Sequence, residues 1–126
     1  METKGQKKRI LLLGTGGTIA SVATKDGLTP AITAEELVTY LPDMSPSIEV
    51  DAVQLLNLDS TNIEVCHWLA MAKAIEENYD AYDGFVFCHG TDTLAYSSAA
   101  LSYLIQHSSK PIVLTGSQKP INLDNT

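Results

Sequence analysis

The chain is poor in cysteine, in aromatic residues and in long apolar runs. Two cysteines, Cys66 and Cys88, occur among 126 residues, of which 6% are aromatic. Two cysteines cannot build the disulfide framework of a small secreted domain, so we expect both to be core residues in a reducing compartment. No stretch approaches the ~20 apolar residues of a membrane span, and the apolar run at residues 10–13 is too short for a signal peptide. We therefore expect a soluble, cytoplasmic protein with no membrane partner.

Positive charge is scarce as well. Eight Lys and Arg residues stand against 15 Asp and Glu, which gives a formal net charge of −7. Such a surface repels a phosphate polymer, so we expect no nucleic-acid partner. The one basic cluster, at residues 4–9, is interpreted as a solvated tail before the first strand. The 3 histidines and 2 cysteines lack metal-ligand spacing, so we expect neither a metal nor another cofactor.

Short apolar runs alternate with helical patterns along the chain. The apolar runs predict strands at residues 9–13, 47–56, 84–88 and 110–114. Helices are predicted at residues 33–41 and 93–107, and a further helix is predicted to begin at a capping box formed by Thr61 and Glu64. Residues 24–33 are predicted to form a loop. This order predicts an α/β fold: a mainly parallel, doubly wound sheet of the flavodoxin or Rossmann kind, with helices on both faces.

Two glycine turns that carry threonine each follow a predicted strand. The first is GTGGTIAS at residues 14–21 and the second is HGTDT at residues 89–93. Ligands bind at the carboxyl ends of the strands in such sheets. Ile19 replaces the third glycine of the dinucleotide motif, and the Gly-Lys-Ser/Thr of a P-loop is absent. These turns therefore favour nucleophilic catalysis, in which a hydroxyl attacks a carbonyl and backbone N–H groups stabilise the oxyanion.

The polar residues near the second turn have alternative interpretations. The carboxylate of Asp92 could bind a substrate ammonium, or Thr91 or Asp92 could cap the following helix. In the polar cluster at residues 59–62, a helix cap on Thr61 is expected, while Ser60 could face the same crevice. His89 could be a general base, although a hydrogen-bonded structural role is commoner beside a buried strand.

Both turns resemble the signature motifs of the bacterial-type L-asparaginase family. The matching stretches are LLGTGGTIAS at residues 12–21 and DGFVFCHGTDT at 83–93, and VLTGSQ at 113–118 is similar to the strand and turn that come next. The resemblance runs through essentially the whole chain and is closer to the cytoplasmic type. It implies conversion of L-asparagine to L-aspartate and ammonia without a cofactor, in a full-length protein that is a homo-oligomer, either a dimer or a tetramer.

The resemblance also implies roles for individual residues. Thr18 would be the nucleophile that attacks the side-chain amide and forms a β-aspartyl ester. Thr91 and Asp92 would also be catalytic, the threonine acting with a lysine further along the chain and the aspartate holding the substrate α-amino group. The implied substrate-binding residues are Gly17, Asp59, Ser60, Gly90, Thr91 and Asp92.

Two features depart from the family pattern. Residues 21–30 lack the tyrosine that the family usually carries in this loop, so Thr29 is considered as a substitute partner for Thr18. The family lysine and the C-terminal domain would lie beyond Thr126. Residues 1–126 are therefore expected to form an incomplete N-terminal asparaginase domain, with the C-terminal domain absent and little or no activity alone.

Two other functions remain open at this point. The first is the related amidotransferase subunit that releases ammonia from glutamine for transfer-RNA-dependent synthesis, which normally has a further N-terminal domain. Only nine residues precede Ile10 here. The second is a non-catalytic amino-acid-binding module that uses the same crevice. Asparagine and glutamine differ by one methylene, worth only about 1–3 kcal/mol in a pocket, so these residues do not decide between them.

Overall fold

The computed structural model describes residues 7–123. Its main sheet contains four parallel strands in the order β4-β1-β5-β6. They are β1 (Lys8–Gly16), β4 (Ile48–Leu58), β5 (Gly84–Cys88) and β6 (Ile112–Thr115). All four predicted strands are therefore present, and the parallel arrangement is confirmed. Lys4, part of the predicted basic tail, lies outside the described residues. The tail interpretation is wrong for Lys8 and Arg9, because both belong to β1 and Arg9 forms an ion pair with Asp51 at 2.9 Å.

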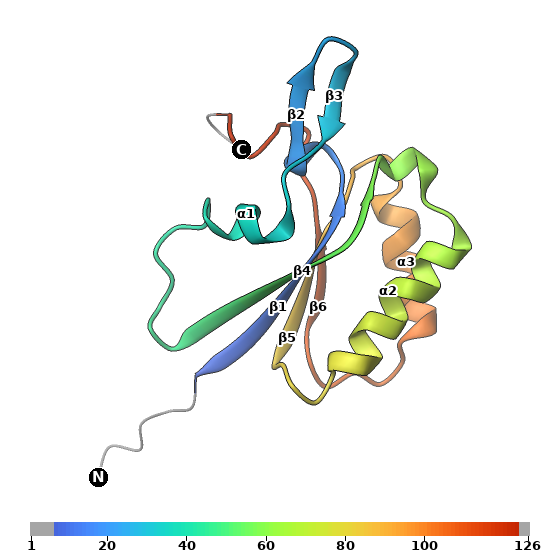
Figure 1. Cartoon of the computed structure of the whole chain (residues 1–126). Helices are drawn as coiled ribbons and strands as arrows, with labels where there is room; N and C mark the ends of the chain where they lie inside the picture. The colour runs from blue at the N-terminus through green and yellow to red at the C-terminus, as the bar shows by residue number, and fades with distance from the viewer. Residues whose placement is uncertain (1–6, 124–126) are drawn as a thin grey trace.

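Helices lie on both faces of this sheet, as expected for the fold. Helices α2 (Val65–Asn78) and α3 (Leu94–Leu104) lie side by side on one face, and the short α1 (Ala34–Val38) lies on the other (Figure 1). The predicted cap of α1 is confirmed, because Glu36 N–H donates to Thr33 Oγ and Thr33 N–H donates back to Glu36. No helix within residues 7–123 is both long and apolar enough to cross a bilayer.

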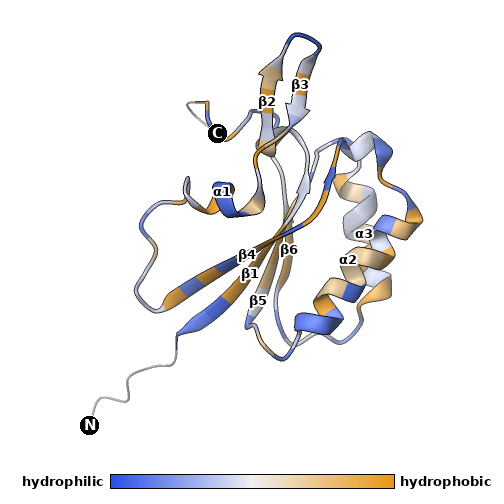
Figure 2. Ribbon diagram, viewed as in Figure 1, coloured by the Kyte–Doolittle hydropathy of each residue, from blue (hydrophilic) through white to orange (hydrophobic). Residues whose placement is uncertain are grey.

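Strand β1 lies inside the sheet and contributes to the core on both faces. Leu11 and Leu13 pack with Phe85, Phe87 and the apolar side of α2, whereas the intervening Leu12 packs towards α1. Successive side chains of a strand point to opposite faces, which explains why an unbroken apolar run suits this position. Strand β4 lies at the sheet edge and alternates between polar and apolar residues along much of its length (Figure 2).

Three local predictions were wrong. Residues 24–33 are not simply a loop, because β2 (Ser21–Thr24) and β3 (Gly27–Pro30) form an antiparallel hairpin. The third helix ends at Leu104 rather than at residue 107. Cys66 is exposed on α2, whereas Cys88 is buried as expected. Two turns of 3-10 helix, η1 (Thr18–Ala20) and η2 (Ser60–Asn62), complete the structure between its strands and helices.

Helix α2 also begins later than predicted. Asp59 accepts a hydrogen bond from Thr61 N–H at 3.0 Å, and this contact caps η2 instead of α2. The cap of α2 is Glu64, whose own N–H donates to His67 Nδ1 at 2.8 Å. The capping box predicted from Thr61 and Glu64 is therefore wrong, because the nearer Asp59 side chain has already bound the Thr61 N–H.

Candidate functional site

The polar turns meet where the strand order of the sheet reverses. From β1, the chain first adds β4 on one side and later adds β5 on the other. Such a switch point leaves a crevice beyond the carboxyl ends of the two central strands. The turn after β1 contains Gly17 and Thr18, and the turn after β5 contains Gly90, Thr91 and Asp92. The topology therefore brings both glycine turns to one place, as the sequence predicted.

The two turns touch each other through their glycines. A Cβ atom added to Gly17 would lie 2.5 Å from Gly90 Cα, and one added to Gly90 would lie 2.6 Å from Ser60 Oγ. Gly17 also has φ +82° and ψ 179°, a backbone conformation available almost only to glycine. A further link comes from the buried Thr15, whose hydroxyl donates to the Cys88 carbonyl at 2.8 Å. The contact between the two turns therefore requires glycine at position 17, and the contact of the second turn with Ser60 requires glycine at position 90.

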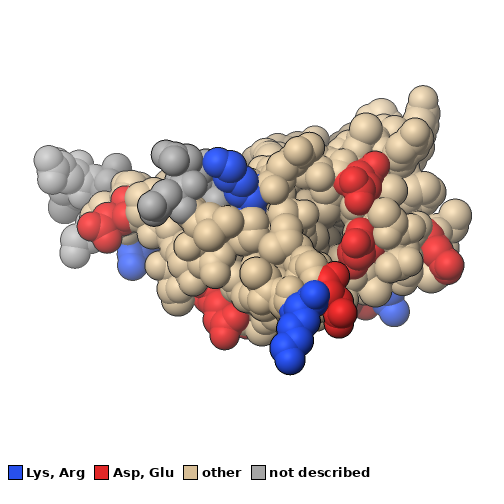
Figure 3. All heavy atoms as spheres, turned by 90° about the horizontal axis from the view of Figure 1, so that it is seen from above, with Lys and Arg blue, Asp and Glu red and all other residues tan. Residues whose placement is uncertain are grey.

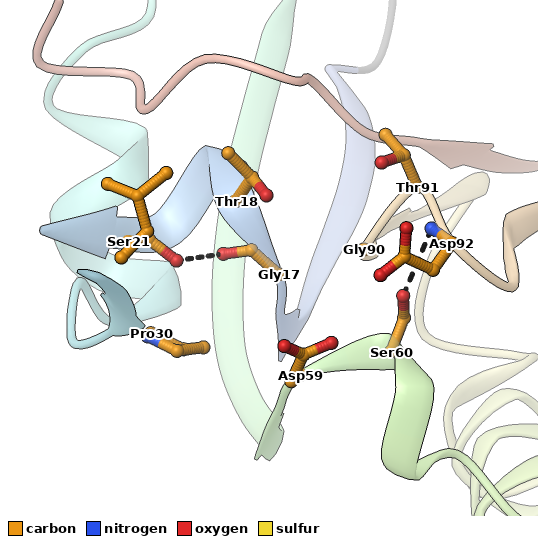
Figure 4. A pocket seen from close by; sticks show the side chains of 10 residues that line it. Gly17, Thr18, Ser21, Pro30, Asp59, Ser60, Gly90, Thr91 and Asp92 are labelled. Carbon is orange, nitrogen blue, oxygen red and sulfur yellow. Dashed lines mark hydrogen bonds between the residues drawn. The ribbon is translucent and has the colours of Figure 1, made fainter. Parts of the chain in front are cut away.

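A small pocket of about 100 Å³ opens between the turns, next to the hairpin. Its lining residues are Gly17, Thr18, Ser21, Leu28, Pro30, Asp59, Ser60, Gly90, Thr91 and Asp92. The structure therefore brings together all seven residues to which the family resemblance gave a catalytic or substrate-binding role, whereas Thr29 and His89 do not line the pocket. The hydroxyls of Thr18 and Thr91 and the carboxylates of Asp59 and Asp92 point toward the same space (Figure 4).

The side chains best suited to chemistry have no protein partner. Within residues 7–123, the hydroxyls of Thr18 and Thr91 and the carboxylate of Asp92 make no hydrogen bond. The backbone N–H groups of Thr18, Gly90 and Thr91 likewise have no acceptor in this part of the chain. A polar cavity with unpaired donors and acceptors is typical of a binding site for a small polar molecule. These groups are available to a ligand.

Ser60 connects η2 to the second turn. Its hydroxyl oxygen accepts a hydrogen bond from Asp92 N–H at 3.1 Å, and its carbonyl accepts one from Thr93 Oγ at 2.9 Å. Ser60 is 3% exposed, so these contacts lie at the buried wall of the pocket. They hold the start of α3 through the Asp92 N–H and the Thr93 hydroxyl and leave the Asp92 side chain free. The alternative in which Thr91 or Asp92 caps α3 is therefore wrong, because neither side chain contacts the helix N-terminus.

Sequence reasoning missed the three lining residues of the hairpin: Ser21, Leu28 and Pro30. The Ser21 hydroxyl is buried and donates to the Gly17 carbonyl at 2.7 Å (Figure 4). Thr29 is not part of the lining, and its hydroxyl lies 3.4 Å from Thr24 Oγ. Side chains alternate along a strand, so Leu28 and Pro30 share one side of β3 and Thr29 takes the other. Thr29 is thus badly placed to assist Thr18. The Asp26–Gly27 pair is a local signal that could have revealed the hairpin.

His89 is buried and hydrogen-bonded through both ring nitrogens. Nδ1 lies 2.6 Å from the Gly90 carbonyl oxygen, and Nε2 lies 2.8 Å from Ser97 Oγ. Burial lowers the pKa of His89 and so favours its neutral form. The ring does not line the pocket, which supports the structural interpretation over the general-base one.

The pocket contains two carboxylates, and no Lys or Arg lines it within residues 7–123. The molecule carries several acidic side chains on the end that holds the strand termini, seen from above in Figure 3. Carboxylates confined together with no cation favour a ligand that brings its own positive charge. An ammonium group beside Asp59 and Asp92 meets this requirement.

Comparison with known proteins agrees with this arrangement. Residues 9–125 match the family model described as "Asparaginase, N-terminal". An L-asparaginase from Thermococcus kodakarensis is 43% identical over 119 residues, which cover 94% of this chain and 36% of that protein. A glutamyl-tRNA(Gln) amidotransferase subunit from Saccharolobus islandicus is 36% identical over 118 residues, covering 91% of this chain and 26% of the relative.

Solved structures show the same similarity in three dimensions. The thermostable L-asparaginase from Thermococcus kodakarensis has a TM-score of 0.83 with 42% identity, over 93% of this chain and 36% of that one. A probable cytoplasmic L-asparaginase from Campylobacter jejuni has a TM-score of 0.79 with 34% identity, over 94% of this chain and 35% of that one. The chain therefore spans about a third of the length of these asparaginases.

Proposed function

The chain belongs to the asparaginase family, and on that premise we propose that its protein hydrolyses L-asparagine to L-aspartate and ammonia through a threonine nucleophile. The observation that carries the proposal is the unpaired Thr18 hydroxyl, which faces a small pocket with two carboxylates and several free backbone N–H groups. Acyl transfer needs these groups: a nucleophile, donors for the oxyanion and a counter-charge that orients the substrate.

The proposed reaction has two steps. Thr18 Oγ attacks the carbon of the side-chain amide, its proton passes to the amide nitrogen, and the C–N bond breaks to release ammonia. The product of this step is a β-aspartyl ester on Thr18. Water then attacks the ester carbonyl, the C–O bond to Thr18 breaks, and the hydroxyl regains its proton as L-aspartate leaves.

The other lining residues serve to orient the substrate. Asp59 and Asp92 are the anions available for the substrate ammonium, and the Ser60 hydroxyl retains one proton to donate to the substrate. Gly17 and Gly90 allow the pocket walls to pack closely, since a Cβ atom at Gly17 would meet Gly90 and one at Gly90 would meet Ser60. Thr91 supplies a second hydroxyl opposite Thr18.

We further propose that residues 1–126 are part of an N-terminal asparaginase domain and release little or no ammonia without a C-terminal domain. Two observations support this proposal. The chain spans about a third of the length of an L-asparaginase relative, and no lysine lines the pocket within the described residues. The lysine that would act with Thr91 is then supplied from outside these residues. Ammonia release from the purified 126-residue chain at a normal enzymatic rate would contradict this view.

The substitution Thr18→Ala tests the proposed reaction. In the complete protein, we expect Thr18→Ala to abolish ammonia release from L-asparagine, while binding of L-aspartate, measured by calorimetry, stays near the wild-type value. The matched variant Thr18→Ser keeps a hydroxyl and should retain measurable turnover. Undiminished turnover in Thr18→Ala would refute the role of Thr18. An aspartate-binding protein with no turnover in the wild type would support the non-catalytic module instead.

A second candidate is hydrolysis of glutamine in an amidotransferase, which is supported by the 36% identity to the glutamyl-tRNA(Gln) amidotransferase subunit. The 43% identity to an L-asparaginase supports asparagine over glutamine as the substrate. Comparing kcat/KM for the two amides in the complete protein separates the candidates. We expect the larger value for asparagine, whereas a larger value for glutamine would favour the amidotransferase.

We also propose a cytoplasmic location and a homo-oligomeric state for the complete protein. A structural neighbour from Campylobacter jejuni is described as a probable cytoplasmic asparaginase, which supports the location. Large apolar side chains that are exposed on α2 and α3 support self-association, since such residues are usually covered in an assembly. They are Val65, Leu69, Tyr96, Tyr103 and Leu104. Light scattering on the complete protein distinguishes a dimer or tetramer from a monomer.

A further inference from the structure

A buried chain of polar side chains runs from α2 through α3 to the turn that holds Thr91. The indole N–H of Trp68 donates to Ser97 Oγ at 2.8 Å, and Ser97 Oγ lies 2.8 Å from His89 Nε2. His89 Nδ1 lies 2.6 Å from the carbonyl oxygen of Gly90. His89 and Ser97 are both fully buried. No step of the proposed hydrolysis uses this chain, although it ends one residue before Thr91.

The partners of His89 determine where its proton lies. A carbonyl oxygen can only accept a hydrogen bond, so the Gly90 contact requires a proton on Nδ1. A neutral ring then has a bare Nε2, which accepts a hydrogen bond from the Ser97 hydroxyl. Ser97 Oγ in turn accepts from Trp68, whose indole N–H can only donate. Every polar atom is satisfied in this arrangement, and the burial that lowers the pKa of His89 favours the same neutral form.

The hydrogen bond to Gly90 also fixes the direction of the next amide. The Gly90 carbonyl and the Thr91 N–H belong to one planar trans peptide, so the two groups point in opposite directions. Because the carbonyl points to the buried His89 ring, the Thr91 N–H points away from that ring, and Thr91 is one of the residues that line the pocket. Within residues 7–123, this N–H has no acceptor.

We propose that His89 is a positioning residue that holds the Gly90–Thr91 peptide so that the Thr91 N–H faces the substrate carbonyl oxygen as it becomes an oxyanion. A donor that is already oriented costs no reorganisation when the charge develops, and it therefore acts mainly on the transition state. Trp68 and Ser97 contribute by fixing the ring and its tautomer. The inference rests on the proposed hydrolysis, and it assigns His89 no contact with the substrate.

Steady-state kinetics on the complete protein test the proposal. His89→Phe removes the donor to Gly90 while keeping a flat ring, and we expect kcat for L-asparagine to fall by about fivefold to tenfold with KM unchanged. His89→Gln keeps an amide N–H that can reach the carbonyl and should recover part of this loss. His107→Gln, a change to an exposed histidine outside the pocket, should leave both constants unaffected.

The kinetic outcomes that overturn the proposal differ from each other. An unchanged kcat in His89→Phe shows that the peptide keeps its direction without the ring. A fall of about 100-fold or more, together with loss of the acid limb of the pH profile, makes His89 a general base. If the wild type does not hydrolyse L-asparagine, the proposed function fails instead, and the orientation of His89 is then judged by the next experiment.

Nitrogen NMR of the wild-type imidazole tests the orientation of His89 without turnover. We expect the neutral His89 ring to carry its proton on Nδ1, and its pKa to lie below that of an ordinary histidine because the ring is buried. A shift of the Nε2 signal in Ser97→Ala, which removes the donor to that nitrogen, would identify the resonance. A neutral ring with its proton on Nε2 would have no donor for the Gly90 carbonyl, and this result would overturn the proposal.

Discussion

The contact between the two glycine turns can be tested by replacing Gly17 with alanine. The new Cβ would lie 2.5 Å from both the Cα and the nitrogen of Gly90, and these are backbone atoms that cannot rotate away. An alanine at φ +82° and ψ 179° costs on the order of 1–3 kcal/mol in backbone strain alone. Separating the turns adds about 1–3 kcal/mol, the usual cost of overpacking. We therefore expect Gly17→Ala to lower the free energy of unfolding by roughly 2–6 kcal/mol.

Gly27→Ala is the matched control for this substitution. Gly27 also has a positive φ, +111°, but an added Cβ would meet nothing within 4 Å. Gly27→Ala should therefore lower the free energy of unfolding by the backbone strain alone, about 1–3 kcal/mol, without the cost of a steric clash. Urea unfolding followed by Trp68 fluorescence measures both losses. Equal losses in the two variants would refute the claim that the turns are packed against each other.

Two further predictions concern side chains remote from the pocket. Hydrogen bonds from Ser108 first, and then from Ser109, lower the pKa of Tyr79 to about 8. Because the folded pKa lies below the ordinary 10.0, this stabilisation is complete above pH 10 and is lost as the pH falls through about 8. Ultraviolet absorbance should show a phenolate with this midpoint, absent in Tyr79→Phe; a midpoint near 10 would contradict the hydrogen-bonded geometry. In native protein, a thiol reagent should label the exposed Cys66 and leave Cys88, because burial raises the pKa of that thiol to about 11. Labelling of both thiols before unfolding would show that Cys88, at the end of β5, is accessible to the reagent and not buried.

The two glycine turns could be recognised in the sequence because their signals are local and repeated. GTGGTIAS follows a short apolar run that is typical of a strand buried on both faces, and HGTDT follows another. In a parallel sheet, strand ends of this kind meet at one edge, so a common pocket followed without knowledge of the side-chain positions.

The hairpin wall of the pocket could not be predicted in the same way. Its strands have only four residues each, and Val22, Leu28 and Pro30 give no regular alternation. Ser21 and Leu28 line the pocket because of the way the hairpin packs beside the turns, and this packing is a tertiary feature that no local pattern shows. The prediction of where α2 begins was wrong for a different reason. Thr61 and Glu64 have the spacing of a capping box, but the Asp59 side chain accepts the hydrogen bond from the Thr61 N–H that the Glu64 side chain would need.

The histidine next to the second turn shows a similar limit. Sequence alone left His89 between a general base and a structural residue. The structure distinguishes these roles because both ring nitrogens are already bonded within the core, one of them to the Gly90 carbonyl. Trp68 and Ser97, which hold the ring, come from two different helices on either side of His89 in the sequence, so no local pattern indicates the contact.

The identity of the nucleophile is tested most directly by trapping the ester during turnover. The complete protein would be mixed with L-asparagine, quenched in acid within a single turnover, digested and analysed by mass spectrometry. We expect an aspartyl adduct on the peptide that contains Thr18, and its absence in Thr18→Ala. An adduct on the Thr91 peptide, or undiminished turnover without any adduct in Thr18→Ala, would contradict the assignment of Thr18 as the attacking hydroxyl.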